Sequence, residues 1–342
     1  MDPLTHVLLG ASVSYATYGR KLGRTAAWVG GLAAFIPDAD VFIRSETDPL
    51  LAIEYHRHFT HALTFAPIGA AMVAGIAAIS RTRRSKFLSL WACAILAYLS
   101  HCLLDAATSY GTQLLWPFSS QRFGWDFISI IDPLFTIPLG LALGWALRRR
   151  HIGIALAGLT IGATYLAIGV VQHARASAAQ AALAEARGHR PERSEMMPTF
   201  ANNLVWRSLY IHGKDIYSDR IRVGWFSGAT IREGTHLPRI QSADLTESER
   251  TRDQNRSFER FAWFSEGWVA RSPGDETVIG DMRYSLSAEA FDPIWGIRFT
   301  APDALIEVAW INRTRERKIN PRELWDEISG ADPRYQRLDQ LR

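Results

Sequence analysis

The feature that most constrains this chain is a series of long apolar stretches confined to its first 175 residues. A helix needs roughly 20 mostly apolar residues to cross about 30 Å of hydrocarbon. Four stretches approach that length, and two shorter, more polar ones precede them. They lie at about 4–19, 25–43, 62–80, 87–105, 130–147 and 151–171. We therefore expect an α-helical polytopic membrane domain of about six segments over residues 1–175.

The second half of the chain has the character of a water-soluble domain. Residues 176–198 are rich in alanine up to residue 190, and Pro191 and Pro198 then mark a boundary, which predicts a helical linker. Beyond it, short alternating apolar runs separated by turn residues predict strands, and one helical pattern interrupts them. The expected strands are 204–211, 221–226, 277–286, 295–300 and 304–311, and the expected helix is 244–264. We expect residues 199–342 to form a small α+β domain, mainly antiparallel.

Basic residues in the short loops predict the orientation of the membrane domain. They are concentrated after the first, third and fifth segments, and such loops are typically cytoplasmic. The residues are Arg20, Lys21, Arg24, Arg81, Arg83, Arg84, Lys86, Arg148, Arg149 and Arg150. Alternation over six segments then places both termini outside a bacterial inner membrane, with the C-terminal domain extracytoplasmic. The net charge of +4 is modest, so we read these arginines as topology signals and expect no nucleic-acid partner.

In this topology the histidines and aspartates of the first half gather at one membrane face. His101 and Asp105 are one helical turn apart, so they share a helix face. Ionisable residues in membrane segments are functional candidates by default. The full set is His6, Asp38, Asp40, His56, His58, His61, His101, Asp105, Asp126 and Asp132. For His58 an interfacial side chain, and for Asp126 a turn cap, are the competing interpretations.

Imidazole and carboxylate side chains together suit Zn²⁺, Mn²⁺ or Fe²⁺ better than Ca²⁺. Converging carboxylates would repel one another without a cation, and a bound ion can also lower the pKa of a water that then acts as a nucleophile. We therefore expect one to three divalent ions, with zinc the first choice and manganese an alternative. Asp40 and Asp132 are candidates for a catalytic acid by position.

Several short motifs carry a family resemblance. They are Met1–His6, Pro37–Asp40, His56–His61, His101–Asp105, Thr108–Thr112 and Asp132–Pro133. Together they resemble the YdjM-like inner-membrane metal-dependent hydrolases, over about residues 1–175. The order His, Pro-Asp, His and His-x-x-x-Asp is also similar, more loosely, to the zinc-dependent phospholipase C and S1/P1 nuclease group.

The resemblance implies roles for individual residues. The implied metal ligands are His6, Asp38, His61, His101 and Asp105, while Asp40, His56 and Asp132 would orient those ligands or bind a second ion. Arg57 would hold an anionic substrate group, unless it is an ordinary interfacial arginine. The hydroxyls of Thr108 and Ser109, in the loop after Asp105, are candidates to bind substrate oxygen.

These observations favour a metal-dependent hydrolase that attacks a phosphoester or related bond of a membrane lipid or lipid-linked substrate at the outer face. The alternatives are a transporter or metal-permeation protein, and a non-catalytic membrane scaffold in which the ion joins helices. Transporters place such sites near the bilayer midplane and often contain repeats. This chain has its cluster at one face and no evident repeat, so the enzyme is preferred. The C-terminal domain is expected to cover the site or to help select the substrate.

Overall fold

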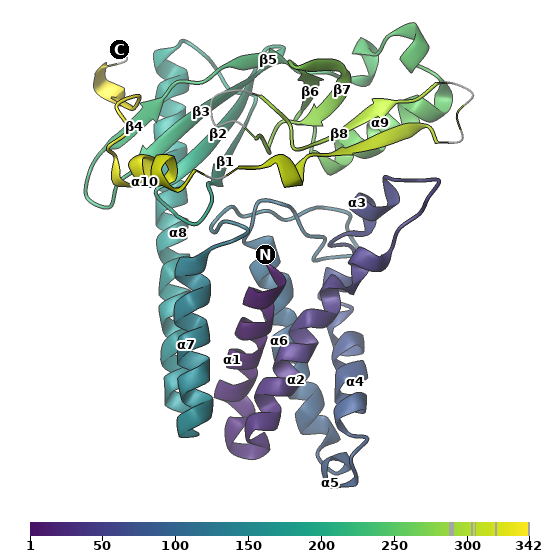
Figure 1. Cartoon of the computed structure of the whole chain (residues 1–342), viewed down its shortest axis with the longest axis vertical. Coiled ribbons are helices and arrows are strands. Elements are labelled where there is room, and N and C mark those ends of the chain that lie inside the picture. The colour runs from purple at the N-terminus through teal and green to yellow at the C-terminus, as the bar shows by residue number, and fades with distance from the viewer. Residues whose placement is uncertain (287–290, 302–303, 305, 319, 341–342) are drawn as a thin grey trace. The chain divides into compact units, whose positions relative to one another are not determined.

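The computed structural model describes residues 1–286, 291–301, 304, 306–318 and 320–340. These residues form two compact units (Figure 1). The first, called here the helical unit, comprises Met1–Phe42, Tyr55–Val171 and Pro198–Asn203. The second, the sheet unit, comprises Ile43–Glu54, Gln172–Met197 and Leu204–Arg342.

The first half of the chain is helical, as the sequence predicts. Its helices are α1 (Pro3–Leu22), α2 (Arg24–Phe35), α3 (Leu51–Tyr55), α4 (Ala66–Ala77), α5 (Arg81–Arg84), α6 (Phe87–Ala106), α7 (Pro133–Arg149) and α8 (Ile152–Ala186), with short 3-10 helices η1 (Ile36–Phe42) and η2 (Phe59–His61). Both α1 and α7 begin with a capping aspartate followed by proline: Asp2 accepts a hydrogen bond from the Thr5 N–H, and Asp132 accepts one from the Leu134 N–H. Such caps satisfy N–H groups that have no partner within the helix.

The predicted count of six membrane spans is not supported. Among the described residues, α6 and α8 are long and apolar enough to cross a membrane, and a third span arises if the bent pair Leu51–His61 and Ala66–Ala77 is counted as one. Helices α2 and α4 have 12 residues each, well short of the roughly 20 that a membrane span needs, and α7, with 17, is not among the candidate spans. Helix α1 has 20 residues but buries polar side chains along its length, including His6 and Ser14.

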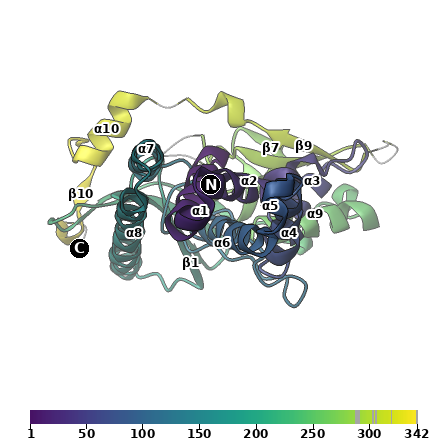
Figure 2. The same cartoon turned by 90° about the horizontal axis from the view of Figure 1, so that it is seen from below.

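Helix α6 is the centre of the helical unit and packs against α1, α2 and α4. Figure 2, viewed along the helices, shows these four together, with α7 and α8 beside each other. Helices α1 and α2 come into backbone contact at Gly10 and Gly30, where a Cβ on Gly30 would lie 2.3 Å from the Gly10 carbonyl oxygen and from Ser14 Oγ. A larger residue would push the two helices apart.

The sheet unit contains two sheets. Its strands are β1 (Arg193–Pro198), β2 (Val205–His212), β3 (Asp215–Val223), β4 (Ala229–Arg232), β5 (His236–Pro238), β6 (Val269–Ser272), β7 (Asp275–Asp281), β8 (Trp295–Phe299), β9 (Val308–Asn312) and β10 (Gln336–Arg337). One sheet has the order β1-β2-β3-β4-β10, with β5 beside β3, and the other the order β6-β7-β8-β9. The pairing is antiparallel from β2 to β4 and throughout the second sheet, which confirms the expected architecture.

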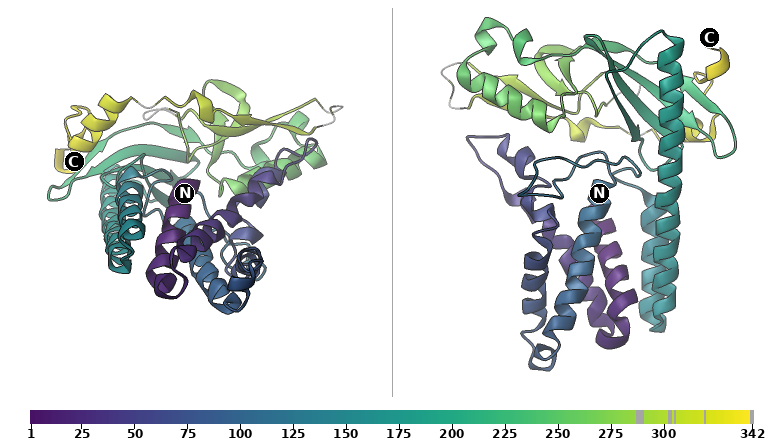
Figure 3. Two further views of the ribbon diagram at one scale, coloured as in Figure 1. Left: turned by 60° about the horizontal axis from the view of Figure 1, so that its bottom comes forward. Right: turned by 180° about the vertical axis from the view of Figure 1, so that it is seen from behind.

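Helices complete the sheet unit. Helix α9 (Arg252–Phe264) falls within the predicted 244–264, and α10 (Pro321–Ser329) follows the second sheet. The end of α8 packs against the first sheet, where Leu183 and Met196 lie in one core with Trp206 (Figure 3). Residues 176–198, predicted as a helical linker, thus contain the end of α8 and strand β1.

Candidate metal centre

Four of the predicted metal ligands come together in the helical unit. Asp38 lies in η1, the 3-10 helix that follows α2, and comes directly after Pro37. His61 is the last residue of η2. His101 and Asp105 lie one turn apart near the end of α6. One ligand atom from each residue lies within 4.8 Å of the others, and we call this set the four-residue cluster.

The spacing of these atoms resembles the edges of a tetrahedron. The Nε2 atoms of His61 and His101 are 3.0 Å apart. Asp105 Oδ2 is 3.1 Å from His61 Nε2 and 3.4 Å from His101 Nε2, and Asp38 Oδ1 is 3.7 Å from both nitrogens. Ligands at 2.0–2.1 Å from a tetrahedral zinc ion are about 3.3–3.4 Å apart. The cluster therefore has the size of a tetrahedral site.

The second nitrogen of each histidine indicates its tautomer. His101 Nδ1 is 2.7 Å from the Ala34 carbonyl oxygen, and a carbonyl only accepts, so Nδ1 carries the proton. His61 Nδ1 is 3.2 Å from Asp40 Oδ2, which likewise favours a proton on Nδ1. Each Nε2 then presents a lone pair to the other across 3.0 Å. Two lone pairs and two carboxylate oxygens at this distance are compatible with a metal cation between them.

Asp40, predicted as a catalytic acid or an orienting group, lies behind His61 and is buried. Its Oδ2 accepts hydrogen bonds from the Arg57 backbone N–H at 2.8 Å and from Thr60 Oγ1 at 3.2 Å, while Oδ1 pairs with His56 Nδ1 at 2.9 Å. Both oxygens are thus engaged. This carboxylate orients the His61 ring, as carboxylates do behind metal-bound histidines.

The other oxygen of Asp105 is held on the side away from His61 and His101. Oδ1 is 2.9 Å from His6 Nε2 and 3.0 Å from Arg57 Nη2, and it also contacts the amino group of Met1. The predicted ligand His6 therefore contacts Asp105, and its ring stacks on His101 with centroids 3.7 Å apart. These contacts leave Oδ2 to face the cluster.

The residues predicted to bind substrate lie near Asp105 but are buried. Arg57 donates from Nη1 to Thr108 Oγ1 at 2.8 Å and to the Asp105 carbonyl at 3.2 Å. Its guanidinium therefore holds Asp105 in place. The Ser109 side chain is also buried, with 6% of the residue exposed. The prediction that these residues bind substrate is not tested by these contacts.

Two other predicted residues lie outside the four-residue cluster. The His56 side chain is 28% exposed and pairs with Asp40. Asp132 caps α7 and accepts a hydrogen bond from the Tyr165 hydroxyl at 2.8 Å, so its carboxylate has a structural role there. The assignment of His56 as a metal ligand and that of Asp132 as a catalytic acid remain predictions.

Two contributors escaped the sequence interpretation. Thr60 hydrogen-bonds Asp40, and its place beside His61 in the motif was a signal that could have been used. The Ala34 carbonyl fixes the tautomer of His101, but any residue type at position 34 would supply such a carbonyl, so the sequence does not point to it. Backbone acceptors of this kind are visible only in three dimensions.

Exposure decides from which side the four-residue cluster can be reached. The side chains of His61, His101 and Asp105 are at most 1% exposed, whereas that of Asp38 is 15% exposed. Asp38 Oδ2 has no hydrogen-bond partner among the described residues. Asp38 is therefore the most exposed member of the four-residue cluster, although its Oδ2 atom is itself buried.

The helical unit and its cluster define a membrane protein with a candidate metal centre near the end of a spanning helix. The YdjM inner membrane protein family matches residues 1–176, just over half of the chain, and the chain belongs to this family. The predicted resemblance to this family is thereby confirmed. The matches give no support to the looser similarity to phospholipase C and S1/P1 nuclease.

Two relatives are similar to this chain. The uncharacterized protein YfhP of Bacillus subtilis (strain 168) is 28% identical over 178 residues, 50% of this chain and 51% of YfhP. The inner membrane protein YbcI of Escherichia coli (strain K12) is 28% identical over 144 residues, 40% of this chain and 82% of YbcI. The chain thus spans about half the length of YfhP. No solved structure matches the chain.

Proposed function

We propose that the four-residue cluster binds one divalent cation, zinc in the first place and manganese as the alternative, and that the protein is a membrane hydrolase. The observation that carries the proposal is the convergence of two Nε2 lone pairs and two carboxylate oxygens, with five of their separations between 3.0 and 3.7 Å. Neutral imidazoles and carboxylates are the ligands that zinc accepts in catalytic sites.

A bound ion of this kind supplies a Lewis acid and a water of lowered pKa. The residues around it have separable tasks. Asp40 orients His61, and Arg57 with His6 holds Asp105 so that Oδ2 faces the cluster. Asp38 Oδ2, without a hydrogen-bond partner among the described residues, is left to accept a hydrogen bond from water or from a substrate hydroxyl.

The proposed substrate is a phosphoester or related bond of a membrane lipid or lipid-linked molecule. His101 and Asp105 lie in the last two turns of α6, which is a candidate span, so the site lies toward one end of that helix. An amphiphilic substrate can present its polar bond at such a depth. A transport site would be expected nearer the middle of the span, which favours the enzyme.

Metal content is the first test. Full-length protein purified in detergent should contain close to one equivalent of zinc or manganese by elemental analysis. His61→Ala and His101→Ala should each remove it, whereas His151→Ala, which replaces a histidine beyond the cluster, should not. Folded protein that contains no metal and cannot be reloaded would refute the proposal.

Activity is the second test. Metal-loaded protein should hydrolyse at least one member of a panel of phosphoesters, phospholipids and lipid-linked phosphates, and chelation or Asp38→Asn should abolish this. Bound metal without any product would indicate an ion that only joins helices. Metal uptake into protein-containing vesicles, without hydrolysis, would indicate a transporter.

A further inference from the structure

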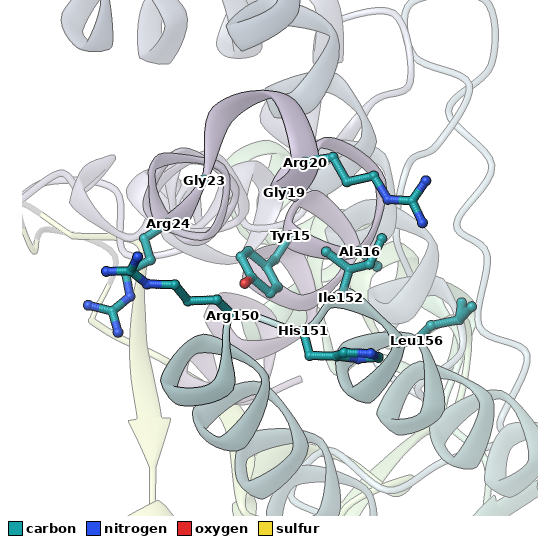
Figure 4. Close-up of a pocket in the computed structure, with 11 residues that line it drawn as sticks. Tyr15, Ala16, Gly19, Arg20, Gly23, Arg24, Arg150, His151, Ile152 and Leu156 are labelled. Carbon is teal, nitrogen blue, oxygen red and sulfur yellow. The ribbon is translucent and has the colours of Figure 1, made fainter.

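A cavity of about 720 Å³ lies in the helical unit between the loop that joins α1 to α2 and the loop that joins α7 to α8 (Figure 4). Its lining is Tyr15, Ala16, Gly19, Arg20, Gly23, Arg24, Arg150, His151, Ile152, Gly153 and Leu156. Figure 4 shows Arg24 and Arg150 on one side of Tyr15 and Arg20 on the other. Three guanidinium groups thus line one cavity, and its lining includes no acidic residue.

This cavity is far from the four-residue cluster. Arg20 follows His6 by fourteen residues in the same helix, which corresponds to about 21 Å at 1.5 Å per residue. The two regions therefore lie at opposite ends of α1. In a membrane-spanning arrangement the ends of the helices lie at the level of the lipid headgroups.

The arginines of the cavity differ in how much of their hydrogen-bonding capacity is used. Arg24 donates from Nη2 to the Leu147 carbonyl at 3.0 Å and so caps the end of α7. Arg20 and Arg150 are exposed, and no carboxylate of the described residues lies within ion-pair distance of either. Two guanidinium groups are therefore available to an anion.

The need for positive charge at these helix ends does not by itself explain why three arginines line one cavity. Orientation in the membrane and the helix dipole require basic residues near these helix ends but do not specify which way they point. Lys21, Arg148 and Arg149 are exposed neighbours that meet this requirement without lining the cavity. The gathering of Arg20, Arg24 and Arg150 around one cavity is the additional feature.

The remaining walls suit a lipid. Tyr15, Ile152 and Leu156 provide apolar surface beside the guanidinium groups. Leu156 of α8, which lines the cavity, is 59% exposed, so hydrocarbon surface lies open at the cavity's edge. A phosphate held by arginine with hydrocarbon beside it is the chemistry of a phospholipid.

We propose that this cavity binds the headgroup phosphate of an anionic phospholipid, with Arg20 and Arg150 as the principal contacts and the acyl chains along α8. Free inorganic phosphate shares the headgroup chemistry but would make no use of the apolar wall formed by Tyr15, Ile152 and Leu156. The site is independent of the proposed hydrolase activity. It would fix the level of this helix end in the bilayer.

The test compares lipid binding by full-length wild type and by two double variants. In native mass spectrometry, wild type in detergent should retain phosphatidylglycerol in preference to phosphatidylcholine. The double variant Arg20→Gln with Arg150→Gln should bind phosphatidylglycerol roughly thirtyfold more weakly, since each basic side chain near an anionic headgroup contributes about 1 kcal/mol. The matched control is Lys21→Gln with Arg149→Gln, which removes the same charge outside the cavity and should keep wild-type affinity.

Three results would overturn the proposal. They are equal weakening by the two double variants, equal retention of both lipids by wild type, and competition by millimolar inorganic phosphate as effective as that by phosphatidylglycerol. If the Arg20→Gln/Arg150→Gln protein does not fold, the exposed single change Arg20→Gln replaces it and should still weaken phosphatidylglycerol binding at least fivefold. Unchanged binding in that variant would equally refute the site.

Discussion

At the scale of single residues, the hydrogen bonds behind the cluster separate residues that bind from residues that orient. Asp40 touches His61 through Nδ1, on the far side of the ring from the cluster. Arg57 touches Asp105 through Oδ1, while Oδ2 faces the cluster. Both residues are buried, so changes at either should act through the residue that they hold.

Asp40→Asn should weaken metal binding without removing a ligand. An amide is a poorer acceptor for the His61 N–H, and changes to such orienting partners typically cost about 10–100-fold in metal affinity. Chelator-competition titration of detergent-purified protein measures this. Asp219→Asn, a change at a buried aspartate of the sheet unit, is the control and should leave the affinity unchanged. An Asp40→Asn protein that binds metal like wild type would show that Asp40 does not orient His61.

Arg57→Met should destabilise the metal-free protein more than the metal-loaded one. The change keeps much of the side-chain volume but leaves the buried Asp105 carboxylate without its guanidinium partner, a loss that typically costs about 3–5 kcal/mol. A bound cation would offset part of that loss. Thermal unfolding with and without zinc measures the difference, with Lys21→Gln as an exposed control. An equal loss of stability in both forms would contradict this account.

At the scale of helices, the position of the site depends on close packing between α1 and α2. Gly10 and Gly30 allow the two backbones to touch. Helix α2 is followed directly by η1, which carries Asp38, and Ala34 near its end accepts from His101. The α1–α2 contact therefore helps to place one ligand and the hydrogen bond that fixes another.

Gly30→Ala should destabilise the helical unit by about 1–3 kcal/mol, since the new methyl group meets the Gly10 carbonyl oxygen and Ser14 Oγ, both at 2.3 Å. The matched control is Gly144→Ala in α7, where a Cβ meets nothing within 4 Å and alanine favours the helix. Unfolding in a denaturing-detergent titration compares the two. Equal stability of both variants would mean that the contact relaxes without cost.

At the scale of the whole molecule, helix α8 contributes to both units. Its residues up to Val171 belong to the helical unit, and those from Gln172 onward belong to the sheet unit. In the sheet unit, Gln180 donates through Nε2 to Ser208 Oγ at 2.8 Å and to the Leu209 carbonyl at 2.9 Å. The end of α8 is therefore part of the sheet unit's core. The hypothesis that this unit covers the four-residue cluster stays a prediction.

A fragment that begins at Gln172 should fold, whereas one that begins at residue 199 should aggregate. The shorter fragment lacks Ala176, Ala179 and Leu183, which cover the buried face around Trp206. An uncovered apolar face promotes association. Circular dichroism and size-exclusion chromatography compare the fragments. A monomeric, cooperatively unfolding 199–342 fragment would show that the end of α8 and strand β1 are both dispensable.

Acid should weaken the sheet unit in a defined window. Hydrogen bonds from Arg334 hold the pKa of Asp332 below its usual range. A depressed carboxyl pKa stabilises the fold above the unfolded-state pKa of about 3.9 and loses this contribution as the pH falls toward the folded-state value. The melting temperature of Asp332→Asn should therefore lie below that of wild type at pH 7, and the gap should narrow below about pH 4. A gap that does not vary with pH would contradict the pairing.

The positions of most elements could be predicted from local pattern. Apolar runs marked the helices of the first half, alternation between turn residues marked β2 and β8, and a helical pattern marked α9. The span count failed because an apolar run does not fix where a helix ends. Pro37 and the polar residues around it end the α2 segment before it reaches the length of a span.

For the candidate site, the sequence determined the residue types and the pairing of His101 with Asp105, because the helical repeat places positions four apart on one face. Only the tertiary structure decided which histidines join them. His61 approaches with Nε2, whereas His6 turns to the other oxygen of Asp105. The direction of a side chain depends on contacts from other helices, here the Ala34 carbonyl and the Asp40 carboxylate, and a linear sequence does not encode those contacts locally.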